Sequence, residues 1–359
     1  MSILPQLQTL SSQLAAILRR EIARGAWGEW LPNERVLSQR LQVSRNTLRT
    51  ALGELQQAGI IRAIHGSGNR ILLRPESVEP AAAPRDLAVL SPEPAERLRP
   101  NVTLWIDRLR VLCGEKGYRL QVVHGRQYFR PNPAAALEKL MRQQPHAGWI
   151  LILGGRATQH WFELNRVPCV VAGTVHVGIS LPYCAQDHRA MARDAAQRLF
   201  ALGHRKIALL TRRSGLAVDA ESEAGFSDAA AGRSDGEVIV CRHDDTVAGV
   251  CLQVRQLMRQ NPAPTGLLVT NAHFHLTVSG CLQQLGLRVP RDVSLISRTD
   301  DPFLGYVTPE PARYAALPRQ MAAGLLTLVE PLLAGRRLPR RSIAIPPRFI
   351  PGLSLGPAP

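Results

Sequence analysis

The sequence predicts an α/β chain in which a small, mainly helical N-terminal unit precedes a larger body built on doubly wound parallel sheets. Two short helical patterns, with a three-residue break between them, occur before residue 60. From residue 86 onward, short apolar runs alternate with amphipathic segments, which is typical of parallel strands covered by helices on both faces. A proline-rich stretch separates the two patterns and predicts a linker. We therefore expect three parts, residues 1–74, 75–85 and 86–359.

The N-terminal unit contains one amphipathic helix followed by two shorter ones. Asn33 can cap the second helix, and residues 42–44 after it are enough only for a turn. Ser44 can cap a third helix, which ends before Gly59, a residue suited to the left-handed conformation that closes helices. Apolar residues recur at helical spacing on this third helix and predict its buried face, namely Leu48, Ala51, Leu52 and Leu55.

The other face of the third helix carries polar donors near its N-terminus: Ser44, Arg45, Asn46, Thr47 and Arg49. Such side chains can hydrogen-bond to base edges in a DNA major groove. After the helix, residues 60–64 and 69–73 have strand character and are joined by a turn with two glycines. The helix pair and ribbon predict a winged helix-turn-helix. The alternative is an ordinary helical hairpin with a solvated basic face.

Residues 10 to 73 resemble the winged helix-turn-helix of the GntR family of bacterial transcription regulators. The resemblance rests on Leu31-Pro32-Asn33-Glu34-Arg35, Val43-Ser44-Arg45-Asn46-Thr47-Leu48-Arg49, Ala51-Leu52, Leu55, Gly59 and Gly66-Ser67-Gly68. Asn33 stands where the family usually has serine, and this change keeps the cap. The resemblance implies that one set of side chains meets DNA, namely Arg35, Ser44, Arg45, Asn46, Thr47 and Arg49. It also implies that the wing tip, at His65, Gly66 and Ser67, enters the adjacent minor groove.

The charge of the chain agrees with a polyanionic partner. The formal net charge is +16, from 44 basic and 28 acidic residues, although charge alone is weak evidence for nucleic-acid binding. The six cysteines form no CxxC pair, so zinc and redox motifs are unsupported. The N-terminus does not resemble a signal peptide, and no apolar run reaches transmembrane length. We therefore expect a cytoplasmic protein with no membrane partner.

The body predicts two lobes, because it contains too many strands for one small sheet. The apolar runs are residues 87–90, 120–123, 149–153, 169–172, 206–210, 238–241, 266–270 and 293–296, with helical patterns between them. In open parallel sheets, ligands bind outside the carboxyl ends of the strands. We therefore expect a ligand cleft between the lobes.

The body also carries a resemblance, over roughly residues 86 to 356. Residues 187–210, 264–271 and 285–296 resemble the LacI/GalR type of effector domain, which has a periplasmic-binding-protein fold. Joining it to a GntR-like head resembles the arabinose-repressor type of regulator. The resemblance implies a repressor controlled by a small-molecule effector. It also implies a homodimer, whose two heads would bind a palindromic operator in double-stranded DNA.

The departures from this type concern the effector site. Sugar-binding members have an arginine where Ser222 stands and an aspartate where Thr299 stands, although Asp300 follows. Asn271 is kept, but the usual aspartate after it is Ala272. Such an arginine and aspartate would clamp sugar hydroxyls, so their absence argues against a simple sugar. Our candidate effector-binding residues are Arg156, Gln186, Arg212, Ser222, Asn271, Thr299 and Asp300, and Arg298 also ends a predicted strand.

No catalytic constellation is evident, so we expect no enzymatic activity and no cofactor. His273 and His275 lie two residues apart at a helix start, a spacing that does not place them on one helical face, so a metal site is unsupported. The sequence also leaves two alternative functions open. One is a solute-binding or enzymatic body with an incidental basic head, and the other is a DNA-binding protein that has lost its ligand.

Overall fold

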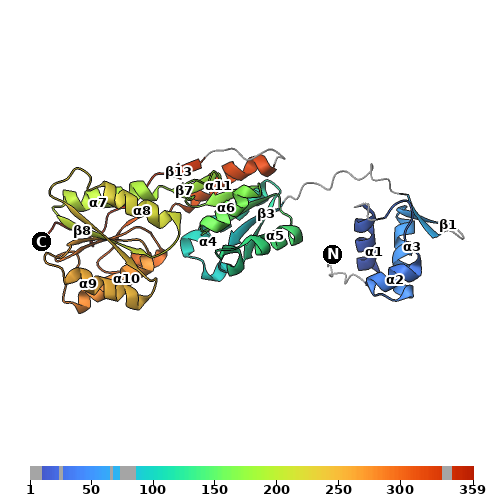
Figure 1. Ribbon diagram of the computed structural model, residues 1–359, viewed down its shortest axis with the longest axis horizontal. Helices are drawn as coiled ribbons and strands as arrows, with labels where there is room; N and C mark the ends of the chain where they lie inside the picture. Colours follow the sequence, from blue (N-terminus) through green and yellow to red (C-terminus); the bar gives the residue numbers. More distant parts are fainter. Residues whose placement is uncertain (1–9, 24–26, 65–67, 73–85, 334–341) are drawn as a thin grey trace, which may run out of the picture. The chain divides into compact units, whose positions relative to one another are not determined.

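The computed structural model describes residues 10–23, 27–64, 68–72, 86–333 and 342–359. It divides into two compact units, Met1–Ala83 and Pro84–Pro359 (Figure 1). The predicted linker, residues 75–85, lies outside the described residues. None of the helices in the described ranges is long and apolar enough to cross a membrane.

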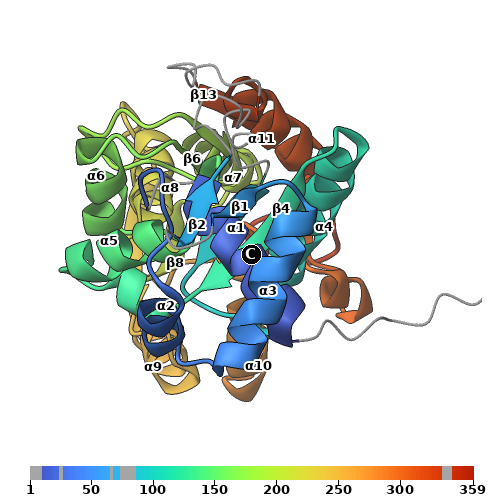
Figure 2. The same cartoon turned by 90° about the vertical axis from the view of Figure 1, so that its right-hand side faces the viewer.

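In its described residues, the first unit consists of three helices and a hairpin. The elements are α1 (Leu10–Ala23), α2 (Glu34–Leu41), α3 (Arg45–Gln57), β1 (Ile61–Ile64) and β2 (Gly68–Ile71). The two strands pair antiparallel, and Figure 2 shows them beside the helices. Leu48, Ala51, Leu52 and Leu55 of α3 are each at most 3% exposed and form one core with α1 and α2. The predicted buried face of the third helix is confirmed.

The helix ends of this unit follow from local side-chain chemistry. The Asn33 carboxamide oxygen accepts a hydrogen bond of 2.9 Å from the backbone amide of Val36 and caps α2. The Ser44 hydroxyl accepts one of 3.1 Å from the amide of Thr47 and caps α3. Gly59 follows α3 with a φ of +69°, as a helix-terminating glycine does. Both predicted caps are confirmed.

Lobe 1 of the second unit is a six-stranded parallel sheet with helices on both faces. Its strands are β3 (Asp86–Ser91), β4 (Arg119–His124), β5 (Gly148–Ile152), β6 (Cys169–Ala172), β7 (Tyr183–Gln186) and β13 (Ser342–Ile345), in the order β13-β7-β6-β5-β3-β4. The helices are α4 (Pro100–Glu115), α5 (Ala134–Gln143), α6 (Arg156–Leu164) and α11 (Pro318–Leu333). One core lies under α4 and α11, and another lies under α5 and α6.

Lobe 2 repeats this architecture. Its strands are β8 (Lys206–Arg212), β9 (Glu237–His243), β10 (Gly266–Val269), β11 (Ser294–Ser297), β12 (Ala312–Tyr314) and β14 (Phe349–Ile350), in the order β14-β12-β11-β10-β8-β9. Only β14 runs antiparallel to its neighbour among these pairings. The helices α7 (His188–Ala201) and α8 (Ala217–Asp228) cover one face, whereas α9 (Val247–Met258) and α10 (Ala272–Gln284) cover the other (Figure 1).

The chain crosses between the lobes three times, after β7, after β12 and after β13. Hydrogen bonds tie the crossings together. The Gln186 carboxamide donates one of 2.9 Å to the carbonyl of Ala315, and the Ala315 amide donates one of 2.8 Å to the carbonyl of Arg348. These crossings hold the carboxyl ends of the two sheets toward a shared cleft. The predicted fold class, a winged helix-turn-helix unit with a two-lobed parallel-sheet domain, is confirmed.

Candidate nucleic-acid interface and ligand cleft

The N-terminal end of α3 is a polar surface. Arg45, Asn46 and Arg49 are exposed, and the Thr47 hydroxyl lies 2.8 Å from that of Ser44. The capped helix end fixes the direction of these side chains, while their donors face solvent. The N-terminal end of α3 can therefore enter a DNA groove while the Ser44 cap stays in place.

Two helices contribute to this surface together. Arg49 on α3 donates a hydrogen bond of 2.8 Å from Nε to the carboxylate of Glu34 on α2, which leaves its terminal nitrogens available. Arg35, beside Glu34, is exposed. The candidate residues on α2 and α3 therefore lie near the N-terminal ends of two helices that this ion pair joins.

The wing is described only in part. The candidates His65, Gly66 and Ser67 lie outside the described residues. In β2, Arg70 lies over the indole ring of Trp30, 6.0 Å from its centre, and lies 3.2 Å from the carboxylate of Glu29. These contacts join the ribbon to the segment that precedes α2.

A cleft of about 300 Å³ lies between the two lobes of the second unit. Lobe 1 contributes an apolar wall that includes Val102 and Trp105 of α4, together with the guanidinium of Arg99 just before that helix. Lobe 2 contributes Arg212 at the end of β8 and Arg298 after β11. The cleft thus lies at the carboxyl ends of strands, where ligands bind in sheets of this kind.

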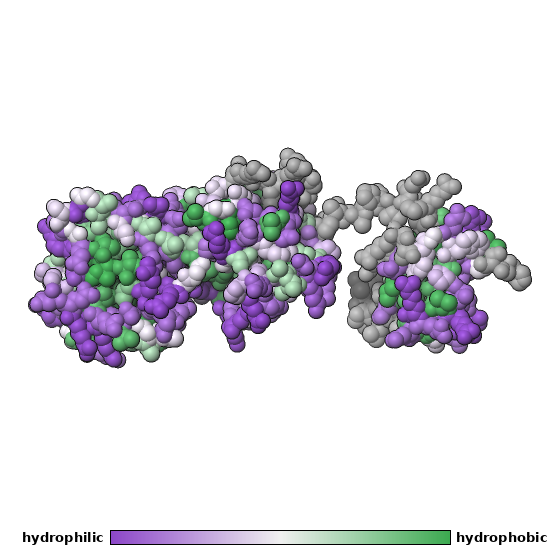
Figure 3. All heavy atoms as spheres, viewed as in Figure 1, coloured by the Kyte–Doolittle hydropathy of each residue, from purple (hydrophilic) through white to green (hydrophobic). Residues whose placement is uncertain are grey.

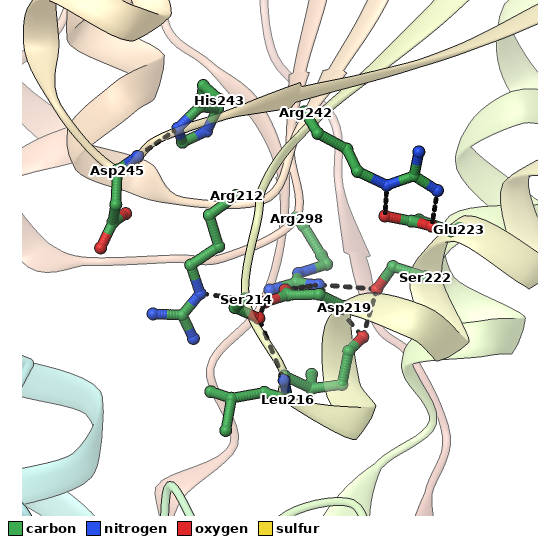
Figure 4. A network of polar contacts seen from close by, with 11 residues as sticks. Arg212, Ser214, Leu216, Asp219, Ser222, Glu223, Arg242, His243, Asp245 and Arg298 are labelled. Carbon is green, nitrogen blue, oxygen red and sulfur yellow. Dashed lines mark hydrogen bonds and ion pairs between the residues drawn. The ribbon is translucent and has the colours of Figure 1, made fainter. Parts of the chain in front are cut away.

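A buried ionic network underlies the lobe 2 side of the cleft (Figure 4). The Asp219 carboxylate on α8 accepts hydrogen bonds from Arg212 Nε at 2.9 Å, from the Ser214 hydroxyl at 2.5 Å and from Arg298 Nη1 at 3.3 Å. Arg298 Nη1 also donates one of 2.6 Å to the Ser222 hydroxyl. One carboxylate therefore serves two guanidinium groups.

Burial and neighbouring charges shift the pKa values of the ionisable groups in and beside this network. Burial by itself would raise the pKa of Asp219, but the charges of Arg298 and Arg212 hold it below its usual value. Burial lowers the pKa of Arg298 to about 10, which still leaves it charged at neutral pH. Burial also lowers the pKa of His188, which lines the cleft, to about 3, with the Arg298 charge acting in the same direction. His188 is therefore neutral at pH 7.

Only some of the candidate effector-binding residues lie on the cleft wall. Gln186, Arg212 and Thr299 line it, as does Arg298. Ser222 lies behind Arg298 and is fully buried.

The other three candidates do not line the cleft. Asn271 caps α10, because its carboxamide oxygen accepts a hydrogen bond of 3.0 Å from the amide of His273. Asp300 pairs with Arg313 at 2.9 Å, and Arg156 donates a hydrogen bond of 2.8 Å to the carbonyl of Val177. Each of these side chains is occupied by a structural contact.

Sequence reasoning missed Arg99, Asp219 and His188. Arg99 lies in the loop after the first strand of lobe 1. Because ligands bind at the carboxyl ends of such strands, this loop could have been examined for site residues. Asp219 sits within a helix, three residues before Ser222, and no sequence signal distinguishes it. Within the described ranges, no group of histidine, cysteine, aspartate or glutamate side chains is arranged to hold a metal ion.

Comparisons with known protein families match both units. Residues 10–71 match the model for bacterial regulatory proteins of the gntR family, and residues 196–355 match the periplasmic binding protein-like domain. The arabinose metabolism transcriptional repressor of Geobacillus stearothermophilus is 25% identical in an alignment 291 residues long, which covers 77% of this chain and 77% of that one.

Solved structures share the fold. The complex of the transcriptional regulator CelR with cellobiose superimposes with a TM-score of 0.66 at 18% identity, covering 90% of this chain and 100% of that one. A LacI family transcriptional regulator from Enterococcus faecium with bound ribose gives 0.63 at 16% identity, covering 76% and 100%. The chain is therefore a transcription regulator in which a DNA-binding domain of the gntR family is joined to a periplasmic-binding-protein-like domain.

Proposed function

We propose that this regulator is a repressor that binds a palindromic operator as a homodimer and is controlled by a small molecule in its interlobe cleft. The observation that carries the proposal is the exposed, donor-rich start of α3. There Arg45, Asn46 and Arg49 face solvent, while the buried side of the same helix forms the core. We place this function in the cytoplasm, where the DNA is.

We propose that some side chains of this unit give affinity for DNA and others give sequence specificity. Arginine contacts to phosphates supply salt-dependent affinity, to which Arg35 and the basic head contribute. Arg45, Asn46 and Arg49 read base edges, with Ser44 and Thr47 contacting the adjacent backbone. The wing tip, at His65, Gly66 and Ser67, is proposed to reach the minor groove.

The homodimer is supported by apolar side chains that face solvent on the second unit. Leu252 of α9 is 53% exposed and Leu276 of α10 is 42% exposed, and these two helices pack against each other. Hydrophobic side chains gather over this lobe on the face drawn in Figure 3. Exposed apolar side chains on neighbouring helices are a feature of interfaces. A second copy would cover them and set the spacing of two half-sites.

Control by an effector is supported by the cleft between lobes that the chain connects by three crossings. A ligand that contacts both lobes favours the closed arrangement, and it shifts DNA affinity only as far as it prefers one state. The bound cellobiose and ribose of the two structural neighbours are carbohydrates. They support a ligand of comparable size here.

Selection of genomic fragments by the purified protein, at low and at high salt, tests the proposal. We expect one palindromic motif to be enriched, with binding that weakens steeply as salt rises. Uniform weak binding to all fragments would contradict sequence-specific regulation. It would favour a solute-binding body whose basic head is incidental. Sedimentation that shows only monomer at micromolar concentration would contradict the homodimer.

A further inference from the structure

The charged side chains that line the interlobe cleft are mostly basic. Arg97, Arg99, Arg212 and Arg298 line it, against one acid, Glu93. The Glu93 carboxylate is already engaged, because it lies 2.6 Å from Arg126 and 3.9 Å from Arg97. The described wall of the cleft therefore carries an excess of positive charge.

The guanidinium groups of lobe 2 are only half neutralised. Asp219 is the shared partner of Arg212 and Arg298, so one negative charge faces two positive ones. Arg212 uses only Nε for this contact, and its terminal nitrogens extend away from Asp219 in Figure 4. Its side chain is 23% exposed and lines the cleft.

Arg99 of lobe 1 has no such partner. Among the described residues, its side chain makes no hydrogen bond or ion pair within 4.0 Å. Burial lowers its pKa most, and the charge of Arg212 lowers it further, so the two guanidinium groups repel each other across the lobes. The charges of Asp301, Asp219 and Asp245 act on the pKa of Arg99 in the opposite direction, but none of these carboxylates forms an ion pair with it within 4.0 Å.

We infer that the cleft binds an anionic effector, a molecule of monosaccharide size whose carboxylate or phosphate bridges Arg99 and Arg212. This inference rests on the proposed role of the cleft as the effector site. Charge-assisted, bidentate hydrogen bonds from arginines to an oxyanion are strong, and a neutral polyol cannot offset two opposed guanidinium charges. The apolar wall at Val102 and Trp105 would contact the carbon skeleton. A volume of about 300 Å³ suits a small ligand.

The geometry also explains how such a ligand would act. Without an anion, repulsion between Arg99 and Arg212 disfavours approach of the lobes. An oxyanion between them converts repulsion into attraction from both sides, so it binds the closed arrangement better than the open one. The same charge that selects the ligand thus drives closure.

Isothermal titration of the full-length protein with matched probes tests the inference. The neutral probes are glucose and ribose, the carboxylates are gluconate and glucuronate, and the phosphates are glucose 6-phosphate, ribose 5-phosphate and inorganic phosphate. The carboxylate and phosphate arms distinguish the two sources of an oxyanion. Each probe is also titrated into R99Q and R212Q, with R108Q on α4 and R213Q after β8 as matched controls. Arg108 and Arg213 are exposed and do not line the cleft.

We expect at least one anionic probe to bind saturably, and R99Q and R212Q each to weaken it by about 10- to 100-fold. The controls should bind as the wild type does, which separates the cleft from non-specific binding at the basic head. Saturable binding of a neutral sugar with no loss in R99Q would overturn the inference and leave an effector cleft standing. Binding of no probe would also overturn it.

Operator binding measured on the same preparations separates this inference from the proposed function. Anion binding that depends on Arg99, in a protein that selects no DNA motif, would support the inference and contradict the repressor. Specific DNA binding in a protein that binds none of the probes would support the proposed regulator and contradict the anionic effector.

Discussion

Arg298, which follows β11, donates a hydrogen bond of 2.6 Å to the hydroxyl of Ser222 on α8. From its resemblance to the LacI/GalR type, the sequence led us to look for an arginine at the position of Ser222. Here a guanidinium reaches the same region from the opposite element, and its carboxylate partner, Asp219, comes from α8. The lobe 2 side of the cleft therefore carries an arginine with a buried aspartate behind it, although neither stands at the position where the resemblance led us to look.

Asp219→Asn tests whether this network holds lobe 2 together. The change leaves Arg298, 5% exposed, without its carboxylate, and breaking a buried pair in this way costs about 3–5 kcal/mol of unfolding free energy. We expect a large drop in the urea midpoint. Asp292→Asn is the control, because Asp292 pairs with Arg288 at the surface, where such a pair contributes about 0–1 kcal/mol. Equal effects of the two changes would contradict a structural role for the buried network.

Gly225 and Gly280 form a matched pair of helical glycines. A Cβ at Gly225 would lie 2.0 Å from the carbonyl oxygen of Arg189, where α8 crosses α7, whereas a Cβ at Gly280 meets no atom within 4 Å. Gly225→Ala should force the helices apart and destabilise the lobe by about 1–3 kcal/mol. Gly280→Ala should stabilise α10 by up to about 1 kcal/mol. Thermal unfolding of both variants would measure this, and a harmless Gly225→Ala would refute the close approach.

His275 should make stability depend on pH. It is 1% exposed, and burial lowers its pKa to about 4. The unfolded chain takes up a proton at this residue below about pH 6.5, whereas the folded chain does not until about pH 4. The stability is therefore complete above pH 6.5 and falls between pH 6.5 and 4, by about 1.4 kcal/mol per pH unit.

His275→Leu should remove this contribution, so urea midpoints at pH 7 and pH 5 should differ less in the variant than in the wild type. The exposed neighbour His273 provides the control, since His273→Gln should keep the pH dependence of the wild type. An unchanged pH dependence in His275→Leu would show that this residue does not titrate as described.

Leu252→Glu tests the proposed face of the homodimer. Placing a charge on an apolar side chain that is 53% exposed should not unfold α9, but it should weaken association through that helix. We expect sedimentation to show more monomer than in the wild type. Leu164→Glu on α6, where the side chain is 69% exposed, should leave the oligomeric state unchanged. If both variants stay dimeric, another face forms the interface.

Local chemistry explains what the sequence could predict. Asn33 and Ser44 cap their helices through hydrogen bonds within three residues, so residue type and spacing were enough. The central strands were predictable because they are apolar on both faces. Gln186 and Arg212 were placed on the cleft because strand ends point there.

The missing elements depend on distant partners. The sequence pattern did not predict β7, β12, β13 or β14, because each has at most four residues and β13 joins the sheet only by pairing with β7. The helix α11 could have been found, since Pro318 begins it and Leu325, Leu328 and Val329 are buried at helical spacing. Arg99 and Asp219 could not be assigned in the same way, because only tertiary packing brings them to one cleft.

Operator binding by Arg45→Ala tests the central claim most directly. Fluorescence anisotropy would compare the variant and the wild type on the selected motif and on a scrambled fragment, with Arg62→Ala in β1 as an exposed basic control. We predict that Arg45→Ala keeps its fold and its weak affinity for the scrambled fragment. It should lose about 1–3 kcal/mol of discrimination for the motif, while the control keeps its preference. Undiminished discrimination in Arg45→Ala would contradict the reading of DNA by α3.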